Sequence, residues 1–331
     1  MPDPLTTSLG LDAPPSCDDR SPLFIVFNLS SGRGDADEVR DEIARSCAAA
    51  GRTHHLLTVD KPEQLAERIE EAVQGAEQSR GIVVAAGGDG TINAVAQATL
   101  GRRCAFGVLP QGTFNYFSRT HAIPADIAAA MALLLESTPQ AVQVGMVNDR
   151  VFLVNASLGL YAKLLEDREA FKARFGRSRV VAFMAGLVTL LSGFPLWDLR
   201  VALRGQEQVL RTPTLFVGNN ALQLERMGLP EAQALEHGAL AAIALRPLGR
   251  LAMLSLLAHG AMGRLGDADE VTRFSFGTLQ VDAVRRRRAT RIKVATDGEV
   301  VWMQMPLVFK VAPQPLWLMK PPPGEGLEAR A

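Results

Sequence analysis

The segment with the clearest chemical content is the turn Gly87-Gly88-Asp89-Gly90-Thr91, which stands between a short apolar run and a helical pattern. Glycine has no Cβ, so the backbone can turn sharply there and approach a ligand closely. The helix that follows would present unpaired N–H groups and about half a positive charge at its first turn. Such a turn predicts a phosphate site, although the glycines alone are equally typical of a tight strand-to-helix connection.

Asp89 adds a carboxylate to this turn. A carboxylate among amides that face a phosphate is unfavourable unless it holds a cation, bonds a ribose or substrate hydroxyl, or accepts a proton. Its presence therefore favours a site with chemistry over a purely structural turn.

Two further loops of small residues follow predicted strands, at Asn28–Gly34 and at Pro110–Asn115. The carboxyl ends of parallel strands meet at one edge of a sheet, so both loops can reach the same crevice as the glycine-rich turn. Each loop alone is a weak signal, because serine and glycine turns are common on surfaces. Their joint position after successive strands predicts a nucleotide site.

The elements that must position these loops alternate between strand and helix. The predicted strands are Leu23–Phe27, His54–Val59, Ile82–Ala86 and Ala105–Leu109, and the predicted helices are Asp37–Ala50, Pro62–Gln74, Ile92–Leu100 and Ile127–Glu136. This alternation predicts an α/β fold with a doubly wound, parallel sheet.

After about Gly145 short apolar runs outnumber helical patterns, which predicts a β-rich second domain. Strands are expected near Val151–Asn155, Leu199–Leu203, Thr214–Asn219, Leu240–Leu245, Phe274–Val281, Arg291–Val294 and Val308–Val311, with helices over Ala162–Ser192 and Gly249–Met262. A length of 331 residues also favours two domains. We expect disordered tails at 1–21 and 319–331, a nucleotide-binding domain at 22–145 and the β-rich domain at 146–318.

Composition narrows the functional class. Lysine plus arginine and aspartate plus glutamate each number 35, so no long-range field favours nucleic acid. The three widely separated cysteines indicate neither a zinc site nor a disulfide framework. The amino-terminal residues lack a secretory pattern, and the longest apolar run, Val180–Phe194, is too short and too interrupted to cross a bilayer. These features predict a cytoplasmic protein.

The ordered set of motifs resembles a known family. FNLSSGRG at Phe27–Gly34, GGDGTIN at Gly87–Asn93, PQGTFNYFSR at Pro110–Arg119 and DGE at Asp297–Glu299 are similar to segments of bacterial lipid kinases related to diacylglycerol kinase and sphingosine kinase. The resemblance extends from Leu23 to about Leu318. GGDGT alone also occurs in NAD kinases, and similar turns occur in phosphofructokinases, so the ordered set carries the specificity.

The resemblance implies an N-terminal α/β domain, a C-terminal β-sandwich, ATP bound between them, and a last segment that returns to the first domain. Glu299 matches the proposed general base, and Asp89 would act through Mg²⁺ or be the base itself. The residues that would contact or shape the nucleotide site are Asn28, Ser31, Gly32, Thr58, Gly87, Gly88, Gly90, Thr91, Asn93, Gly112 and Thr113.

Three local features bear on this resemblance. Asp297-Gly298 between apolar runs also predicts a β-hairpin, which is compatible with a catalytic Glu299. Members of the family often carry an acidic pair that helps to hold a structural magnesium in the second domain, whereas this chain reads Glu236-His237-Gly238-Ala239-Leu240 there. That metal site is therefore in doubt, and His237 is interpreted as a surface or turn residue. Val217–Asn220 resembles a strand end near the cleft, without an assigned role.

A lipid substrate requires work at a membrane surface, so peripheral membrane contact is expected. The apolar stretch Phe183–Leu191 suits either a lipid-facing helix or a core helix, and Arg285–Arg288 suits either anionic headgroups or a solvated loop. The acceptor lipid stays open between diacylglycerol, monoacylglycerol, a sphingoid base, ceramide and phosphatidylglycerol. The oligomeric state is likewise open, with a homodimer as one option.

Two other functions share part of the pattern. An NAD kinase would share GGDGT, but the PQGTFN loop and the DGE turn disfavour it. A non-catalytic nucleotide-sensing module would keep the glycine loops and would need neither Asp89 nor Glu299.

Overall fold

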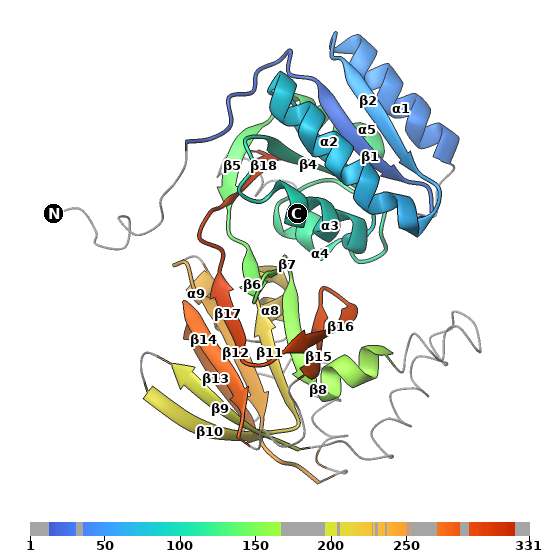
Figure 1. The fold of residues 1–331 in the computed structure, drawn as a ribbon. Helices are drawn as coiled ribbons and strands as arrows, with labels where there is room; N and C mark the ends of the chain where they lie inside the picture. The colour runs from blue at the N-terminus through green and yellow to red at the C-terminus, as the bar shows by residue number, and fades with distance from the viewer. Residues whose placement is uncertain are drawn as a thin grey trace, which may run out of the picture. The chain divides into compact units, whose positions relative to one another are not determined.

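The computed structural model describes residues 13–30, 36–166, 196–203, 206–226, 228, 231–235, 237–249, 252, 270–284 and 291–321 (Figure 1). Its residues divide into two compact units, one up to Val144 and again from Ala312, the other from Gly145 to Val311. The chain rejoins the first unit where the Ala312 amide donates to the Val144 carbonyl at 2.8 Å.

The first unit contains an α/β sheet. Its elements are β1 (Leu23–Asn28), α1 (Ala36–Ala49), β2 (His54–Val59), the 3₁₀ turn η1 (Pro62–Gln64), α2 (Leu65–Ser79), β3 (Ile82–Gly87), α3 (Asp89–Thr99), β4 (Ala105–Pro110), α4 (Tyr116–Thr120), α5 (Ile127–Glu136), β5 (Thr138–Val142) and β18 (Leu316–Lys320). The strand order is β2-β1-β3-β4-β18-β5. All neighbours pair in parallel except β5, which runs antiparallel to β18. The predicted α/β class with a parallel sheet is confirmed.

The strand order fixes where a ligand crevice can form in this unit. From β1 the chain moves to one side to make β2, and from β2 it moves back across to make β3. Because such crossovers are right-handed, α1 and α2 cover opposite faces of the sheet. α1 packs with α5, and α2 packs with α3 (Figure 1). The point between β1 and β3, where the direction reverses, is where open α/β sheets bind ligands at the carboxyl ends of their strands.

Local sequence explains why these elements form. Every residue of β3 and β4 is buried, as expected for central strands covered on both faces.

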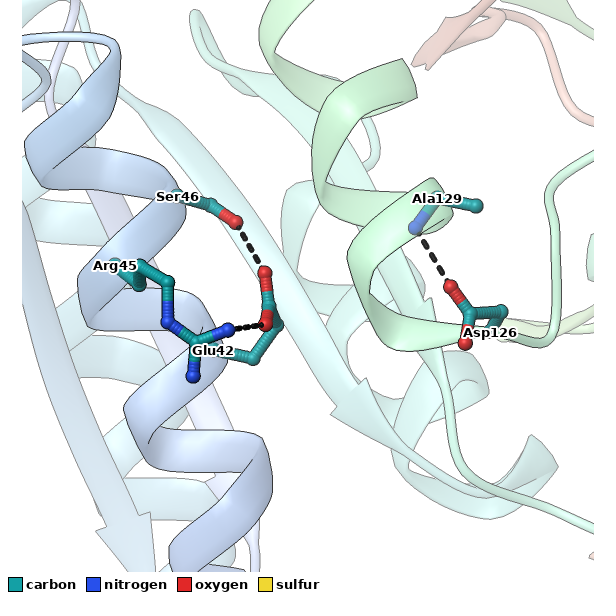
Figure 2. Close-up of polar contacts among 5 residues, drawn as sticks. All are labelled: Glu42, Arg45, Ser46, Asp126 and Ala129. Carbon is teal, nitrogen blue, oxygen red and sulfur yellow. Dashed lines mark hydrogen bonds and ion pairs between the residues drawn. The ribbon is translucent and has the colours of Figure 1, made fainter.

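Figure 2 shows polar contacts on α1 and at the start of α5. The Asp126 carboxylate accepts from the Ala129 amide at 2.9 Å, an N-cap that stabilises a helix by about 1 kcal/mol. On α1, Glu42 accepts from the Arg45 guanidinium and from the Ser46 hydroxyl.

The second unit is a β-sandwich. Its elements are β6 (Gly145–Val147), β7 (Arg150–Phe152), β8 (Asn155–Gly159), β9 (Trp197–Leu203), β10 (Gln206–Thr212), β11 (Thr214–Gly218), α8 (Ala221–Arg226), α9 (Ala232–Leu235), β12 (Leu240–Leu245), β13 (Val271–Phe276), β14 (Thr278–Ala283), β15 (Arg291–Thr296), β16 (Glu299–Gln304) and β17 (Leu307–Val311). They form two six-stranded antiparallel sheets, β10-β9-β14-β17-β6-β7 and β13-β12-β11-β8-β15-β16. One apolar core, including Phe152, Leu215, Ile292 and Phe309, draws on both sheets.

Several elements differ from the sequence-based expectation. The strand predicted at Val151–Asn155 is two short strands, β7 and β8, and the run Phe274–Val281 spans the junction of β13 and β14 at Gly277. α3 begins at Asp89 instead of Ile92, so the carboxylate lies inside the first helical turn.

The domain limits also differ at both ends. Met319 and Lys320 belong to β18 of the first unit, although a tail was predicted there. The predicted second domain was 146–318, but its residues from Ala312 onward belong to the first unit. At the amino-terminal end, the Ser21 carbonyl accepts from buried Arg52 at 3.0 Å, which ties this part of the predicted tail to the first unit.

Two expectations about membranes concern residues that the structure does not describe. Phe183–Leu191 and Arg285–Arg288 both lie outside the described residues. Among the helices that are described, none has the length and apolar character needed to cross a bilayer.

A partly buried histidine gives the first unit a pH-dependent stability. Burial, with a smaller contribution from the Lys320 ammonium, lowers the pKa of His121 from 6.5 to about 3. Its ring lies edge-on against Phe117, with 4.6 Å between ring centroids. Between these two pKa values the unfolded chain binds a proton that the folded protein does not, so stability falls as the pH decreases from 6.5.

We expect the free energy of unfolding of the wild type to fall by about 2 kcal/mol more than that of a His121→Phe variant between pH 6.5 and pH 4.5. Phenylalanine keeps an aromatic ring against Phe117 and has no proton to bind. Urea unfolding of both proteins at the two pH values measures the difference. Equal pH dependence would show that His121 is not held neutral by the fold.

Candidate functional site

The end of β1 and the start of α3 are joined by a side-chain hydrogen bond. The Asn28 amide donates through Nδ2 to Thr91 Oγ1 at 2.9 Å, which links the last residue of β1 to the first turn of α3. The other end of the amide, Asn28 Oδ1, accepts from the backbone and the hydroxyl of Ser30 at 3.1 and 2.7 Å. Asn28 and buried Thr91 therefore connect β1 to α3 at the point where the strand order reverses, which is where open α/β sheets bind ligands.

The glycines allow two loops to touch through their backbones. The Gln111 amide donates to the Gly87 carbonyl at 2.8 Å. A Cβ built on Gly112 would lie 3.2 Å from Gly88 Cα and 2.6 Å from Asn115 Oδ1, so no larger residue fits without a shift. A Cβ on Gly87 would meet the Thr91 side chain at 2.8 Å. The GGDGT and PQGTFN loops are thus in contact, as the sequence indicated.

The N-terminus of α3 is left open for a ligand. Gly88 is its N-cap residue, and no side-chain cap is present. The first intrahelical bond at this end runs from the Ile92 amide to the Gly88 carbonyl at 3.0 Å, which leaves the preceding amides without a partner inside the helix. Uncapped amides at the positive end of an eleven-residue helix are suited to bind an anion.

Asp89 lies beside these amides and is only partly satisfied. Its Oδ2 accepts from the Asn115 backbone amide at 3.3 Å. Burial raises the pKa of Asp89, and hydrogen bonds from the backbone amides of Asn115 and Tyr116 oppose this effect. Within the described part of the chain, Asp89 Oδ1, Gln111 Nε2 and Asn115 Oδ1 are buried without a hydrogen-bond partner. Buried polar atoms are normally paired, so these three atoms are suited to contact a ligand, an ion or a water.

The donor set at Asp89 fits a magnesium ion. Mg²⁺ in phosphoryl-transfer sites is commonly held by one or two carboxylates together with substrate phosphates. Among the residues that the structure describes, no group of three or more His, Cys, Asp or Glu side chains could form a complete metal cage. A single buried carboxylate oxygen beside free helix amides suits a metal that arrives with a nucleotide.

The other predicted nucleotide residues differ in exposure, and their contact with a nucleotide stays a prediction. Thr58 stands near the end of β2, opposite Phe27 of β1. Gly90 and Thr113 are exposed, whereas Asn93 is half-buried on α3. Ser31 and Gly32 lie outside the described residues.

The DGE segment forms the predicted hairpin in the second unit. Thr296 pairs with Glu299, and Asp297 and Gly298 between them have φ angles of 48° and 94°. Positive φ at both central residues is typical of a type I′ turn. The Asp297 carboxylate accepts from the backbone amides of Leu153, Val154 and Asn155 at 2.7 to 2.9 Å, which ties the turn to the segment between β7 and β8.

Glu299 presents its carboxylate at the end of this hairpin. Its side chain is 58% exposed, and Oε2 accepts from Arg150 Nη2 at 2.6 Å. Asp89 belongs to the first unit and Glu299 to the second. A shared role for the two carboxylates therefore stays a prediction.

Two other predicted features lie elsewhere in the second unit. His237 is exposed, and its Nδ1 lies 3.0 Å from the Gln233 carbonyl oxygen, as expected for a surface residue. Glu236 lies outside the described residues. Asn220 caps α8 by accepting from the Gln223 amide at 2.9 Å, so at least part of the role of this strand end is structural.

Sequence reasoning did not select Gln111, Asn115 or Arg150 as site residues. Asn115 has φ 47°, a left-handed conformation that asparagine tolerates well, and its position three residues after Gly112 was a usable signal. Arg150 carried no such signal, because its link to Glu299 spans 149 residues of sequence.

Comparison with known proteins covers both units. Residues 22–147 match the family described as "Diacylglycerol kinase catalytic domain", and residues 156–320 match "YegS C-terminal NAD kinase beta sandwich-like domain". A crystal structure of a diacylglycerol kinase from Bacillus anthracis str. Sterne has a TM-score of 0.64 and 18% identity, and the similarity covers 92% of this chain and 97% of that one. This similarity shows the fold.

Curated relatives match over shorter regions. A protein of Cronobacter sakazakii named "Probable lipid kinase YegS-like" is 38% identical over 109 residues, which are 31% of this chain and 36% of that protein. A "Diacylglycerol kinase" of Staphylococcus saprophyticus is 30% identical over 137 residues, 41% of this chain and 44% of that protein. The matched regions thus span less than half the length of both relatives.

Proposed function

This chain belongs to the bacterial diacylglycerol kinase and lipid kinase family, and from that premise we propose that it transfers the γ-phosphate of ATP to a lipid hydroxyl, with diacylglycerol as the favoured acceptor. The observation that carries this proposal is the combination of uncapped amides at the start of α3 with unpaired buried polar atoms on Asp89, Gln111 and Asn115. Such an arrangement is suited to a polyphosphate and its cation.

The residues of the first unit would bind and orient the nucleotide. The first-turn amides of α3 would donate to phosphate oxygens. Gly88 and Gly112 have no side chains, so the phosphates can approach the backbone closely at these two residues. Asn28 and Thr91 would hold the crevice in shape through their hydrogen bond. Asp89 would hold Mg²⁺, which supplies charge neutralisation of the phosphates when it is bound.

Glu299 of the second unit would act on the acceptor. In the proposed step the lipid hydroxyl oxygen forms a bond to the γ-phosphorus, the bond from that phosphorus to the bridging oxygen of ADP breaks, and the hydroxyl proton passes to the Glu299 carboxylate. Phosphoryl transfer depends mainly on positioning and charge neutralisation, and a base on the incoming hydroxyl contributes about 10² to 10⁴ in rate.

The same proposal includes action at a membrane surface, because the acceptor resides there. We propose a peripheral protein at the inner face of the cytoplasmic membrane, with no nucleic-acid partner. The acceptor could also be a sphingoid base, ceramide or another lipid, because apolar residues that line acyl pockets are interchangeable.

The decisive experiment is transfer of label from [γ-³²P]ATP to a panel of detergent-dispersed lipid hydroxyls, with and without Mg²⁺. The panel comprises diacylglycerol, monoacylglycerol, a sphingoid base, ceramide and phosphatidylglycerol, with NAD as a soluble acceptor. Labelled phosphatidic acid as the main product would support the proposal. Labelled NADP instead would assign the NAD kinase reaction, and ATP binding with no labelled product would favour a nucleotide-sensing module.

A further inference from the structure

Arg150 makes two directed contacts with the DGE hairpin. Its Nη2 donates to Glu299 Oε2 at 2.6 Å, and its Nε donates to Thr296 Oγ1 at 3.0 Å. Arg150 is the first residue of β7, so it reaches from one sheet of the sandwich to β15 and β16 of the other. The two sheets are thus joined by a side chain beside Glu299.

The anchor points of this contact are firmly held. Thr296 is 2% exposed and pairs with Glu299 in the hairpin register. The segment that follows β7 is fixed to the same turn, because Asp297 accepts from three consecutive amides of residues 153–155. A change in the position of β7 relative to the hairpin would break both sets of bonds together.

We propose that Arg150 is a positioning residue for Glu299, which it holds by one carboxylate oxygen so that the other can receive a proton from the acceptor hydroxyl. This inference rests on the proposed function, in which Glu299 is the base. Within the described residues Glu299 Oε1 has no partner, whereas Oε2 is engaged by Arg150. The geometry therefore presents one defined oxygen for chemistry.

The physical reason is loss of rotational freedom before the reaction. An exposed glutamate samples several rotamers, and fixing such a side chain costs conformational entropy that the Arg150 contact has already offset before the acceptor binds. The planar guanidinium sets direction as well as charge, which a lysine ammonium does less well. An exposed ion pair adds little to stability. The inference therefore predicts a large effect on turnover and a small effect on melting temperature.

The first test compares Arg150→Gln, Arg150→Lys and a matched control, Arg211→Gln. Arg211 forms an ion pair with Asp198 at 3.7 Å on the same unit and takes no part in the proposed machinery. We expect Arg150→Gln to lower kcat about 10- to 50-fold, within the range of a general-base contribution, with KM for ATP unchanged. Arg150→Lys should recover part of this loss, and Arg211→Gln should match the wild type. Equal kcat for Arg150→Gln and wild type would overturn the inference.

A double variant separates positioning from a general structural role. If Arg150 acts through Glu299, then Arg150→Gln should cause no further loss of kcat in a Glu299→Gln background. Losses that multiply in the double variant would show that Arg150 acts independently of Glu299, and would reject the proposal.

An activity-independent measurement keeps this inference distinct from the proposed function. Side-chain ¹⁵N NMR should show slow rotation of the Arg150 guanidinium in the wild type and faster rotation in Glu299→Ala, with Arg211 unaffected. Unrestricted rotation in the wild type would reject the held geometry whether or not a lipid is phosphorylated. Restricted rotation in a protein that phosphorylates no lipid would contradict the proposed function and leave the Arg150–Glu299 contact established.

Discussion

Replacement of Glu299 by glutamine is expected to lower lipid phosphorylation by about 10²- to 10⁴-fold while ATP binding changes less than about twofold. Glutamine has nearly the same shape and keeps a carbonyl oxygen that can accept from Arg150, so the hairpin should keep its conformation. It cannot take a proton from an attacking hydroxyl at neutral pH. The loss should therefore fall on kcat instead of on KM for ATP.

Steady-state kinetics of labelled lipid product, with ATP affinity from calorimetry, measures both parts of this prediction. Glu207→Gln is a matched control, because Glu207 is an exposed acid in the same unit, 3.8 Å from Arg200. Its kcat should equal that of the wild type. Unchanged turnover in Glu299→Gln would remove Glu299 from the base role and would transfer that role to Asp89, the alternative that the family resemblance left open.

The parts of the fold that follow from local pattern were predictable. β3 and β4 are apolar along their whole length because both faces are covered, and their alternation with helices indicates parallel strands. The hairpin at Asp297-Gly298 follows from a two-residue turn signal.

Local pattern does not predict pairings between distant segments. β18 pairs with β4 and β5, and nothing in its own five residues distinguishes that sheet from the sandwich. Only the family resemblance implied that the last segment returns to the first domain, and the structure confirms that return. The spacing of residues along the chain does not predict the ion pair between Arg150 and Glu299, because 149 residues of sequence separate the two. The residue types of the GGDGT and PQGTFN loops were sufficient to predict their convergence. The sequence did not show that the side-chain atoms Gln111 Nε2 and Asn115 Oδ1 would be buried without a hydrogen-bond partner.

Asp89→Asn is expected to lower Mg²⁺-dependent turnover by at least about 100-fold. The same substitution is expected to stabilise the first unit. Removing the carboxylate removes the group that would hold the cation, so the phosphates lose charge neutralisation in the transition state. In the ligand-free protein that same charge is unfavourable, since burial raises the pKa of Asp89 more than the amides of Asn115 and Tyr116 lower it. Asparagine retains an oxygen for the Asn115 amide and has no charge to bury.

The sign of the pH effect gives this prediction its sharpest test. A raised pKa means that the folded protein binds a proton more readily than the unfolded chain, so the stability penalty of Asp89 is fully present above the raised pKa and vanishes below about 3.8. Asp89→Asn should therefore raise the melting temperature near pH 7.5, and the gain should disappear toward pH 4. Calorimetric scans at several pH values, with Asp126→Asn as a control for an exposed helix-capping acid, measure this difference. A melting temperature that falls in Asp89→Asn at pH 7.5 would mean that the carboxylate stabilises the ligand-free turn, and the cation site would lose its main structural argument.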